Sequence, residues 1–295
     1  MSNDLLNRGF LVSENHRNVH TFSTNYWAGD WSRQILMISD PHWDNPKCNR
    51  ELLKRHLDDA VTRNAKIIIN GDLFCLMQGW GDPRSNKSDI RPEHNNKNYL
   101  DSIIETAVEW FAPYAGHIAL IGRGNHESSV QKRRETDILQ RFTDMMNLIH
   151  RPEEKIHIGG YGGWVRFMFD REKSKDVQSV KMKYFHGAGK DPEVTMGMIG
   201  NHRRQSFIAN ADIIWTGHIH QNVEATMTYE TLNAAGNVEL RDTEHIITST
   251  YKEEYVDGHG GWHVERGARP KPLGGRWLEF YLEQGDVKFD HFRAK

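Results

Sequence analysis

Five short apolar runs, spread over the first three quarters of the chain, predict the buried strands of a sheet. They occupy residues 35–38, 66–70, 117–121, 180–185 and 211–215. Short runs that are nearly continuous in apolar residues are typical of strands covered on both faces. Residues 50–64 and 99–111 instead carry apolar side chains every three or four positions, which is the spacing of one helix face. This alternation favours parallel strand pairs with helices packed on them.

The last third of the chain has a different pattern, in which strand-like segments are separated by turns. Such segments begin at residue 222, and residues 277–283 and 287–292 flank a turn with Gly285 at its centre. The second pair predicts a β-hairpin. We therefore expect antiparallel strands from this region to complete the sheets of an α/β fold, within a single domain that spans residues 1–295.

Three polar segments interrupt the strand and helix patterns. They are residues 79–98, 187–195 and 251–275, none of which has apolar periodicity. Long loops in a compact domain are usually functional or disordered. We expect these loops to form the rim of a substrate site.

Composition narrows the class of protein. The 295 residues include 37% hydrophobic residues, as in ordinary globular proteins, and carry a net charge of -2. The mean hydropathy of -0.72 is quite polar, so we expect long exposed loops. A near-neutral charge disfavours a broad nucleic-acid-binding surface. Two cysteines make no disulfide framework, and no apolar run reaches the roughly 20 residues of a membrane helix. Because the first twenty residues lack a signal-peptide pattern, the prediction is a soluble, cytoplasmic protein with no membrane partner.

Each apolar run is followed by side chains that can bind a metal ion. They are Asp40 and His42, Asp72, Asn125 with His126, His186, and His218 with His220. Sites in open α/β sheets form beyond the carboxyl ends of strands, so we expect these side chains to converge. In extended chain, residues two apart point to the same side, which lets Asp40 and His42 face one ion. His218 and His220 have the same spacing, and Pro41 favours extended backbone before it.

The types of ligand narrow the choice of metal. Carboxylate, amide and imidazole groups without thiolate suit Mn, Fe, Zn or Mg rather than a structural zinc held by cysteines. Seven groups are too many for one catalytic ion with an open position, but they suit two ions that share a bridging carboxylate. Two such ions can clamp the attacking and leaving oxygens of a phosphoryl group. His157 and His202 are alternatives to His186, which has the least motif around it.

The ordered blocks D-x-H, G-D, G-N-H-E, H and G-H-x-H, from residue 40 to residue 220, resemble the calcineurin-like metallophosphoesterase superfamily. The resemblance implies a four-layer αββα sandwich, in which two mixed β-sheets are flanked by helices and a binuclear site lies at the sheet ends. By motif, it implies one ion held by Asp40, His42 and His220, a second held by Asn125, His186 and His218, and Asp72 as the bridge.

The same resemblance implies a catalytic role for His126. In the family, a metal-bridging hydroxide attacks phosphorus, and this histidine would protonate the leaving oxygen or steady the phosphate. An ordinary pKa of about 6.5 suits either task. The protein-phosphatase branch places a supporting Asp three residues after the bridging Asp, whereas Cys75 stands at that position here. The stretches G-D-L-F and G-H-I-H-Q resemble the DNA-repair nuclease branch instead.

Basic and histidine side chains near the site strands are candidates for binding the substrate phosphate. The candidates are Arg123, Arg133, Arg203, His259 and His263. For the basic runs that contain Arg133 and Arg203, the competing interpretation is a solvated helix face. Arg123 could instead brace the turn before Asn125.

These features together predict a metal-dependent phosphoesterase, and within that class a phosphodiesterase acting on small nucleotide-like substrates. We expect two divalent ions, with Mn²⁺ first and Fe, Zn, Ni or Mg as alternatives. Three other functions stay open: a DNA or RNA nuclease, a phosphomonoesterase or protein phosphatase, and a metal-bound scaffold without catalysis. The expected partner is a small phosphate-ester substrate, and the oligomeric state is left open.

Overall fold

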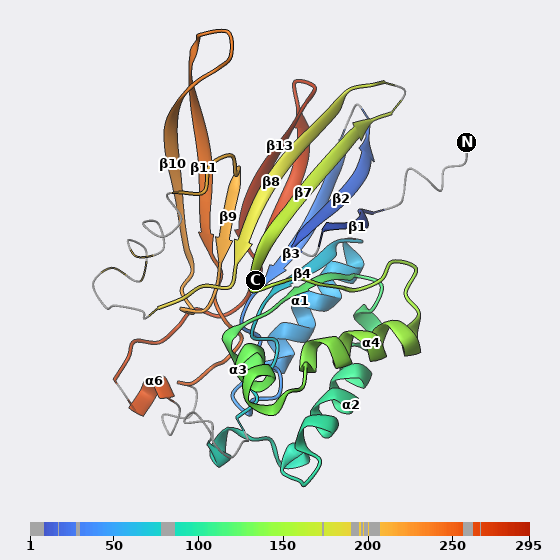
Figure 1. Ribbon diagram of the computed structural model, residues 1–295, viewed down its shortest axis with the longest axis vertical. Coiled ribbons are helices and arrows are strands. Elements are labelled where there is room, and N and C mark those ends of the chain that lie inside the picture. The colour runs from blue at the N-terminus through green and yellow to red at the C-terminus, as the bar shows by residue number, and fades with distance from the viewer. Residues whose placement is uncertain are drawn as a thin grey trace.

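A computed structural model describes residues 9–16, 18–27, 30–77, 86–172, 174–189, 207–255, 262–265 and 267–295, together with residues 195, 197 and 200. Two β-sheets dominate these residues, and the longer helices gather at one end of the strands (Figure 1). In the described part of the chain, no helix is long and apolar enough to cross a membrane.

The larger sheet has seven strands and mixes parallel with antiparallel pairs. In spatial order the strands are β1 (Leu11–His16), β2 (Val19–Tyr26), β7 (Gly162–Arg171), β8 (Val177–Phe185), β9 (Ile213–Thr216), β11 (Val238–Ile247) and β10 (Val223–Leu232). Side chains along β7 alternate between buried and more exposed positions. Such alternation is typical of a sheet with one covered face.

The smaller sheet has six strands with a parallel centre. Its spatial order is β13 (Asp286–Arg293), β12 (Arg276–Glu283), β3 (Ser32–Ile38), β4 (Lys66–Asn70), β5 (Ile118–Gly122) and β6 (His157–Ile158). Strands β3 to β6 pair in parallel, whereas β12 runs antiparallel to both of its neighbours. The five strands expected from apolar runs are therefore confirmed as β3, β4, β5, β8 and β9, and the C-terminal hairpin is confirmed as β12 and β13.

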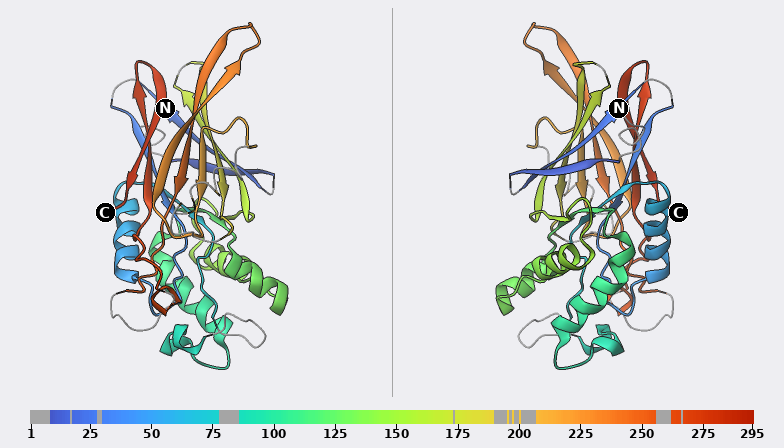
Figure 2. Two further views of the ribbon diagram at one scale, coloured as in Figure 1. Left: turned by 90° about the vertical axis from the view of Figure 1, so that its left-hand side faces the viewer. Right: turned by 90° about the vertical axis from the view of Figure 1, so that its right-hand side faces the viewer.

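In the described residues, four helices of ten or more residues share an apolar layer with the six-stranded sheet and lie toward one end of the strands (Figure 2). They are α1 (Arg50–Thr62), α2 (Tyr99–Phe111), α3 (Asn125–Arg134) and α4 (Ile138–His150). The shorter helical elements are α6 (Trp262–Glu265) and the 3-10 turns Lys87–Asp89, Pro92–His94 and Ala112–Tyr114. The side chains of Asn49 and Asp137 cap α1 and α4 by accepting backbone N–H bonds. The two helices expected from periodicity are confirmed as α1 and α2.

Two apolar layers hold the elements together. One lies between the sheets and contains Phe167, Trp215 and Phe280, and the other lies between the six-stranded sheet and the helices and contains Leu36 and Phe111. The mixed two-sheet α/β fold with flanking helices is therefore confirmed. Strands from early and late parts of the chain join both sheets, in keeping with a single domain, which stays a prediction.

Candidate metal centre

The carboxyl ends of five strands bring the predicted ligands together. Asp40 and His42 follow β3, Asp72 follows β4, Asn125 opens α3 just after β5, His186 follows β8, and His218 and His220 follow β9. The pairing of β3 with β4 continues past the strands, because the Asp40 and His42 amides donate to the carbonyls of Gly71 and Asp72. We call these seven ligand residues the strand-end cluster.

The first group in this cluster contains Asp40, His42 and His220. Asp40 Oδ1 lies 3.3 Å from His220 Nε2 and 4.0 Å from His42 Nε2. Asp40 is buried, and its Oδ1 makes no hydrogen bond of good geometry. The other carboxylate oxygen accepts from the His218 amide at 2.8 Å and from the Ser39 hydroxyl. Leaving a buried oxygen without a hydrogen bond costs about 1–3 kcal/mol of folding free energy. We therefore interpret Oδ1 as a metal ligand rather than as a structural hydrogen-bond acceptor.

The second group contains Asp72, His186 and His218, with Asn125 beside it. His186 Nε2 lies 3.2 Å from Asp72 Oδ2 and 3.2 Å from Asn125 Oδ1. The other His186 nitrogen, Nδ1, donates to the Asn70 carbonyl at 2.8 Å. A hydrogen bond of this kind fixes the tautomer of a metal-binding histidine. His186 Nε2 is also 3.9 Å from Asp40 Oδ1, so the two groups adjoin.

The backbone geometry expected for the paired ligands is wrong. Asp40 and His42 have φ angles of 52° and 48°, and His218 and His220 have φ angles of 67° and 54°. These values lie in the left-handed region and not in the extended region. His218 and His220 also fall into different groups. Left-handed backbone at a non-glycine residue costs about 1–3 kcal/mol, and it persists where the surrounding structure holds it in place.

Gly217 and Gly124 leave space for the two carboxylates of the strand-end cluster. A Cβ at Gly217 would lie 1.8 Å from Ser39 Oγ and 2.6 Å from Asp40 Oδ2, and a Cβ at Gly124 would lie 2.0 Å from Asp72 Oδ1. Both distances to the nearest atom are far below van der Waals contact. The glycines in the G-N-H-E and G-H-x-H blocks therefore permit close approach of the backbone to the two carboxylates.

The charges of the cluster create a demand for positive charge. Burial raises the pKa of Asp40 and of Asp72, yet His186 and the other imidazoles lower both values below the usual range. At His186, burial is outweighed by Asp72 and Asp40, which raise its pKa to about 10. Burial and His126 lower the pKa of His42 well below its ordinary value. The two carboxylates thus favour a positive charge beside them, while His42 offers a neutral imidazole.

The donor set fits divalent cations. It combines two buried carboxylates, an amide oxygen and four imidazoles, which suit borderline and hard metal ions. Cys75 lies beside His42 and His126, but burial raises the pKa of its thiol, so it stays protonated and is a poor ligand. The two-ion assignment that the resemblance implies is compatible with this geometry and stays a proposal.

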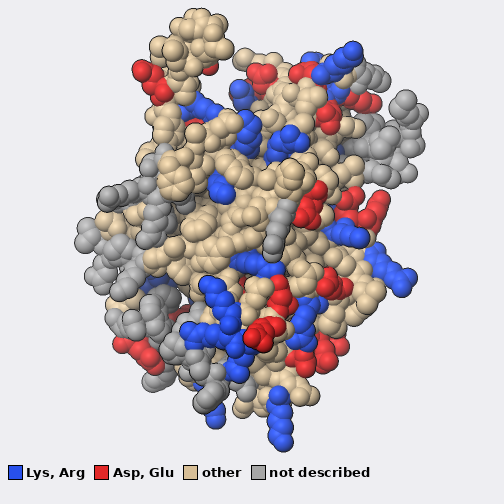
Figure 3. Space-filling model, in the orientation of Figure 1, with Lys and Arg blue, Asp and Glu red and all other residues tan. Residues whose placement is uncertain are grey.

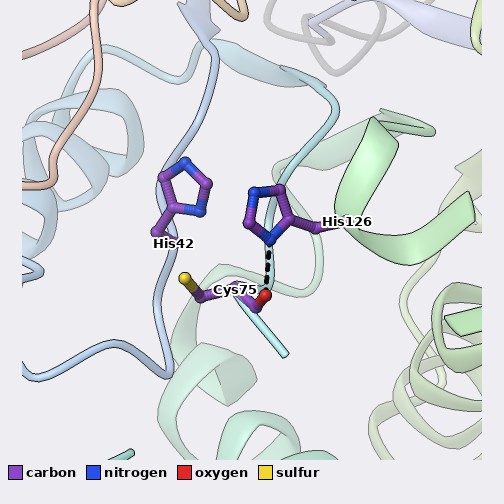
Figure 4. Close-up of side chains that lie close together, drawn as sticks. All are labelled: His42, Cys75 and His126. Carbon is purple, nitrogen blue, oxygen red and sulfur yellow. Dashed lines mark hydrogen bonds between the residues drawn. The ribbon is translucent and has the colours of Figure 1, made fainter. Parts of the chain in front are cut away.

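His126 is held by a backbone carbonyl instead of the missing aspartate. Its Nδ1 donates to the Cys75 carbonyl at 2.5 Å, and Figure 4 shows the two rings of His42 and His126 side by side above this residue. The opposite ring nitrogen, Nε2, lies 3.8 Å from Asp72 Oδ2. The main chain at position 75 therefore supplies the support that the Cys75 side chain could not, and it fixes the tautomer of His126.

Asp44, which sequence reasoning missed, holds the Cys75 carbonyl in place. This buried carboxylate accepts the amide N–H of Cys75 at 2.5 Å and of Leu76 at 2.9 Å. Leu76 has a left-handed φ of 56°, so the loop needs such restraint. The only signal in the sequence was its place two residues after His42, which does not distinguish it from a surface aspartate.

Glu127, the last residue of the G-N-H-E block, is a second residue without an assigned role. It is buried and accepts the amide N–H groups of Asp72, Phe74 and Gly124 at 3.0–3.2 Å. Burial and the neighbouring Asp72 raise its pKa to about 8, and the backbone donors oppose that rise. Glu127 thereby ties the loop after β4 to the beginning of α3, which carries Asn125 and His126.

The proposed phosphate-binding residues are only partly placed. Arg123 forms a bidentate ion pair with Asp137 at 2.6 and 2.7 Å, which favours the bracing interpretation. Arg133 is exposed in the last turn of α3. Arg203 and His259 lie outside the described residues, as does the side chain of His263.

The described parts of the three polar loops differ in their relation to the cluster. Residues 86–98 form two 3-10 turns, and only residues 187–189 and 195 are described in the second loop. At the start of the third loop, the amide of Tyr251 and the hydroxyl of the preceding Thr250 donate to the Asp40 carbonyl. Lys252 follows them and contributes to the lowered pKa of His42, so this segment reaches the site. The role of the loops as a substrate rim stays a prediction.

Comparison with solved structures finds distant likenesses. Vacuolar protein sorting 29 from Cryptosporidium parvum shares 12% identity, with 90% of this chain and 99% of that chain covered at a TM-score of 0.38. Zinc-complexed Vps29 from Entamoeba histolytica shares 11% identity, with 88% and 98% covered at a TM-score of 0.32. GAP50, described as the anchor in the inner membrane complex of Plasmodium, shares 9% identity, with 90% and 89% covered at a TM-score of 0.39. These values carry no argument about function, and no curated protein matches the chain.

A comparison with protein-family models identifies the family of this chain. The model of the calcineurin-like phosphoesterase family matches residues 33–222, a range that contains His126 and the whole strand-end cluster. The match covers well over half of the 295 residues. The chain therefore belongs to the calcineurin-like phosphoesterase family, whose general activity is metal-dependent hydrolysis of phosphate esters.

Proposed function

We propose that this protein is a phosphodiesterase that hydrolyses small nucleotide-like phosphodiesters and requires two divalent metal ions, with Mn²⁺ as the first choice. The observation that carries the proposal is the position of Asp72. Its carboxylate lies 3.2 Å from His186 Nε2 and 3.8 Å from His126 Nε2, and His186 in turn adjoins Asp40 of the first group. We therefore expect Asp72 to contact both ions and to lie next to His126, the proposed proton donor.

Each part of the cluster would have a separate task. Asp40, His42 and His220 would hold one ion, Asn125, His186 and His218 the other, and Asp72 would contact both. Two ions would supply a positive clamp on the phosphate and a more acidic water. His126, with Nδ1 committed to the Cys75 carbonyl, can use only Nε2 toward a substrate. When protonated there, it can donate that proton to the leaving oxygen.

A preference for small substrates follows from the distribution of charge. The net charge is -2, and on the face seen in Figure 3 basic and acidic side chains are interspersed. Basic side chains gather there over α3, whose last turn contains Lys132, Arg133 and Arg134. A local basic group suits one phosphate more than a long polyanion, whose binding needs an extended positive track.

The test is hydrolysis of bis-p-nitrophenyl phosphate and p-nitrophenyl phosphate by chelator-treated protein resupplied with Mn²⁺, Ni²⁺, Zn²⁺ or Mg²⁺. Faster turnover of the diester, lost in Asp72→Asn, supports the proposal. Faster turnover of the monoester would replace it with a phosphatase. No turnover with any metal, in protein that holds two ions, would refute a general small-substrate activity.

Two rival functions have their own discriminating results. A nuclease would cleave single-stranded oligonucleotides with binding that weakens steeply as salt rises, because phosphate contacts release counterions. A non-enzymatic scaffold would keep its cellular function in His126→Ala, whereas an enzyme would lose turnover.

A further inference from the structure

A second group of metal-capable side chains lies at one edge of each of the two sheets. It consists of Glu14 on β1, His20 on β2 and His157 on β6, and we call it the sheet-edge cluster. β1 is an edge strand of the seven-stranded sheet, and β6 is an edge strand of the six-stranded sheet. The group shares no residue with the strand-end cluster.

Strand register places the first two residues on one face. Glu14 and His20 are direct partners in the antiparallel pair of β1 and β2. Directly opposed residues have Cβ atoms about 4.5–5.5 Å apart and point to the same side. On its other side, His20 pairs with Val165, which is buried between the sheets. His20 therefore faces inward, toward the layer where β6 brings His157.

His20 is the unusual member of the group. Its side chain is fully buried, and neither Nδ1 nor Nε2 has a hydrogen-bond partner. Burying a polar group without a partner costs roughly 1–3 kcal/mol in proteins, so each such case calls for an explanation. Apolar residues of similar size would avoid this cost in a sheet core. An imidazole that is buried and unpaired beside a second imidazole and a carboxylate is suited to a metal ion.

The distances fit a site that closes on an ion. One ligand atom from each of the three residues lies within 4.8 Å of the others, and His157 Nδ1 is 3.9 Å from Glu14 Oε2. The His20 and His157 rings are 5.5 Å apart and steeply inclined. Ligand atoms around tetrahedral zinc lie about 2.0–2.2 Å from the metal, so small side-chain movements would bring all three into range.

The surroundings support binding at neutral pH. Burial and His157 lower the pKa of His20 to about 4, and burial lowers the pKa of His157 as well. Both imidazoles are therefore neutral near pH 7, the form that binds metals.

A cavity lies beside the cluster. It has a volume of about 630 Å³, and its walls include Glu14 and His157 together with the polar side chains of Gln131, Gln140 and Asn147. A three-ligand zinc site keeps its fourth position for water or a substrate group. This cavity provides space and polar groups for such a fourth ligand.

We propose that Glu14, His20 and His157 form an additional divalent transition-metal site, with Zn²⁺ as the expected ion and a fourth position open to the polar cavity. The ion would join the edge strand of one sheet to the edge strand of the other. It would also bind one of the two buried His20 nitrogens that have no hydrogen-bond partner. The ligand set of two imidazoles and one carboxylate suits Zn²⁺ better than Mg²⁺ or Ca²⁺, which prefer oxygen ligands.

The test compares zinc content in variants of the full chain. Chelator-treated protein is dialysed against Zn²⁺ at pH 7.5, and bound zinc per chain is measured by mass spectrometry after washing. Glu14→Gln/His157→Gln should bind one equivalent fewer than wild type, while His16→Gln, an exposed histidine at the end of the same strand, should bind as wild type. Equal zinc content in wild type and the double variant would overturn the proposal.

A second measurement separates this site from the strand-end cluster and guards against misfolding. In the Asp72→Asn background, Co²⁺ should still give the strong visible absorption of a four-coordinate ion, and adding Glu14→Gln alone should remove it. Glu14 is exposed, so this single change should leave the folded structure intact, as checked by near-ultraviolet circular dichroism. An absorption band that persists in the Glu14→Gln variant with unchanged affinity would also refute the site.

Discussion

We propose metal binding at both the strand-end and the sheet-edge cluster, but the backbone positions their ligands in different ways. In the strand-end cluster, five of the seven ligand residues have left-handed backbone, and both carboxylates accept further hydrogen bonds from the main chain. In the sheet-edge cluster, all three residues lie in β-strands, and none has a positive φ. Strained backbone that is held in place by neighbouring groups is common at reactive sites. A metal ion that links two sheets needs no such strain, because strand pairing already positions its ligands. The comparison therefore supports placing the proposed hydrolysis at the first cluster and the proposed link between the two sheets at the second.

The largest effect should come from Asp72→Asn, which keeps the shape of the side chain and removes the charge of the proposed bridge. Losing several kcal/mol of charge stabilisation corresponds to a fall of roughly 10³-fold or more in kcat for the diester. Zinc at the sheet-edge cluster should be unaffected. Turnover and metal content are measured side by side with Asp286→Asn, an exposed control. Activity close to that of the control would remove Asp72 from the mechanism.

His126→Ala should separate proton transfer from metal binding. We expect kcat to fall roughly 10²-fold or more, the usual contribution of general acid catalysis, with metal content unchanged. The His126 ring lies beside His42 and 3.8 Å from Asp72 Oδ2, but the backbone amides of both ligands make hydrogen bonds of their own, so we expect the ligands to stay in place. Steady-state kinetics and metal analysis are compared with His16→Ala. A loss of bound metal in His126→Ala would show that this histidine is a ligand and would break the assignment.

Asp44→Asn should give an intermediate effect through His126. One carboxylate oxygen becomes an NH₂ group that cannot accept the Cys75 or Leu76 amide, so the carbonyl that orients His126 should shift. Outer partners of catalytic groups typically contribute about 10–100-fold. We expect kcat to fall within that range while KM changes little. An equal fall in a His126→Ala background would contradict this route, because no His126 would remain for Asp44 to position.

The smallest effect concerns the pH dependence of stability at His56, which lies outside both clusters. Burial lowers its pKa from the ordinary 6.5 to about 4, and its Nδ1 is 2.8 Å from the Tyr251 hydroxyl. As pH falls below 6.5 the unfolded chain takes up a proton first, so folding stability should decrease from pH 6.5 toward pH 4. Denaturant unfolding of chelator-treated protein at pH 7 and 5 should show a weaker pH dependence in His56→Gln than in wild type. The same dependence in both would exclude His56 as a source of acid sensitivity.

Sequence reasoning located the strand-end cluster because its residues follow apolar runs in chain order. Asp40, Asp72 and His186 each come directly after a strand core, or one residue later, and buried strands are recognisable from composition alone. The local backbone was not predictable, because left-handed φ angles at Asp40 and His218 depend on contacts between distant segments. Asp44 and Glu127 were missed for a similar reason, since their partners are backbone amides and carry no side-chain signature.

The sheet-edge cluster was beyond the reach of sequence reasoning. Glu14 and His20 are partners only because β1 and β2 pair with a particular register, and His157 joins them from the other sheet. Nothing in the pattern around residue 157 indicates that neighbour. From the sequence, His157 is only an alternative to His186 as a ligand of the strand-end cluster. The structure places it with Glu14 and His20 instead.

The proposed two-ion site at the strand ends is tested most directly by anomalous X-ray diffraction from crystals soaked in Mn²⁺. We expect two peaks about 3.5–4 Å apart on either side of Asp72. One should lie beside Asp40, His42 and His220, and the other beside Asn125, His186 and His218. A single peak, or no peak at a saturating concentration of Mn²⁺, would contradict a two-ion site at the strand ends.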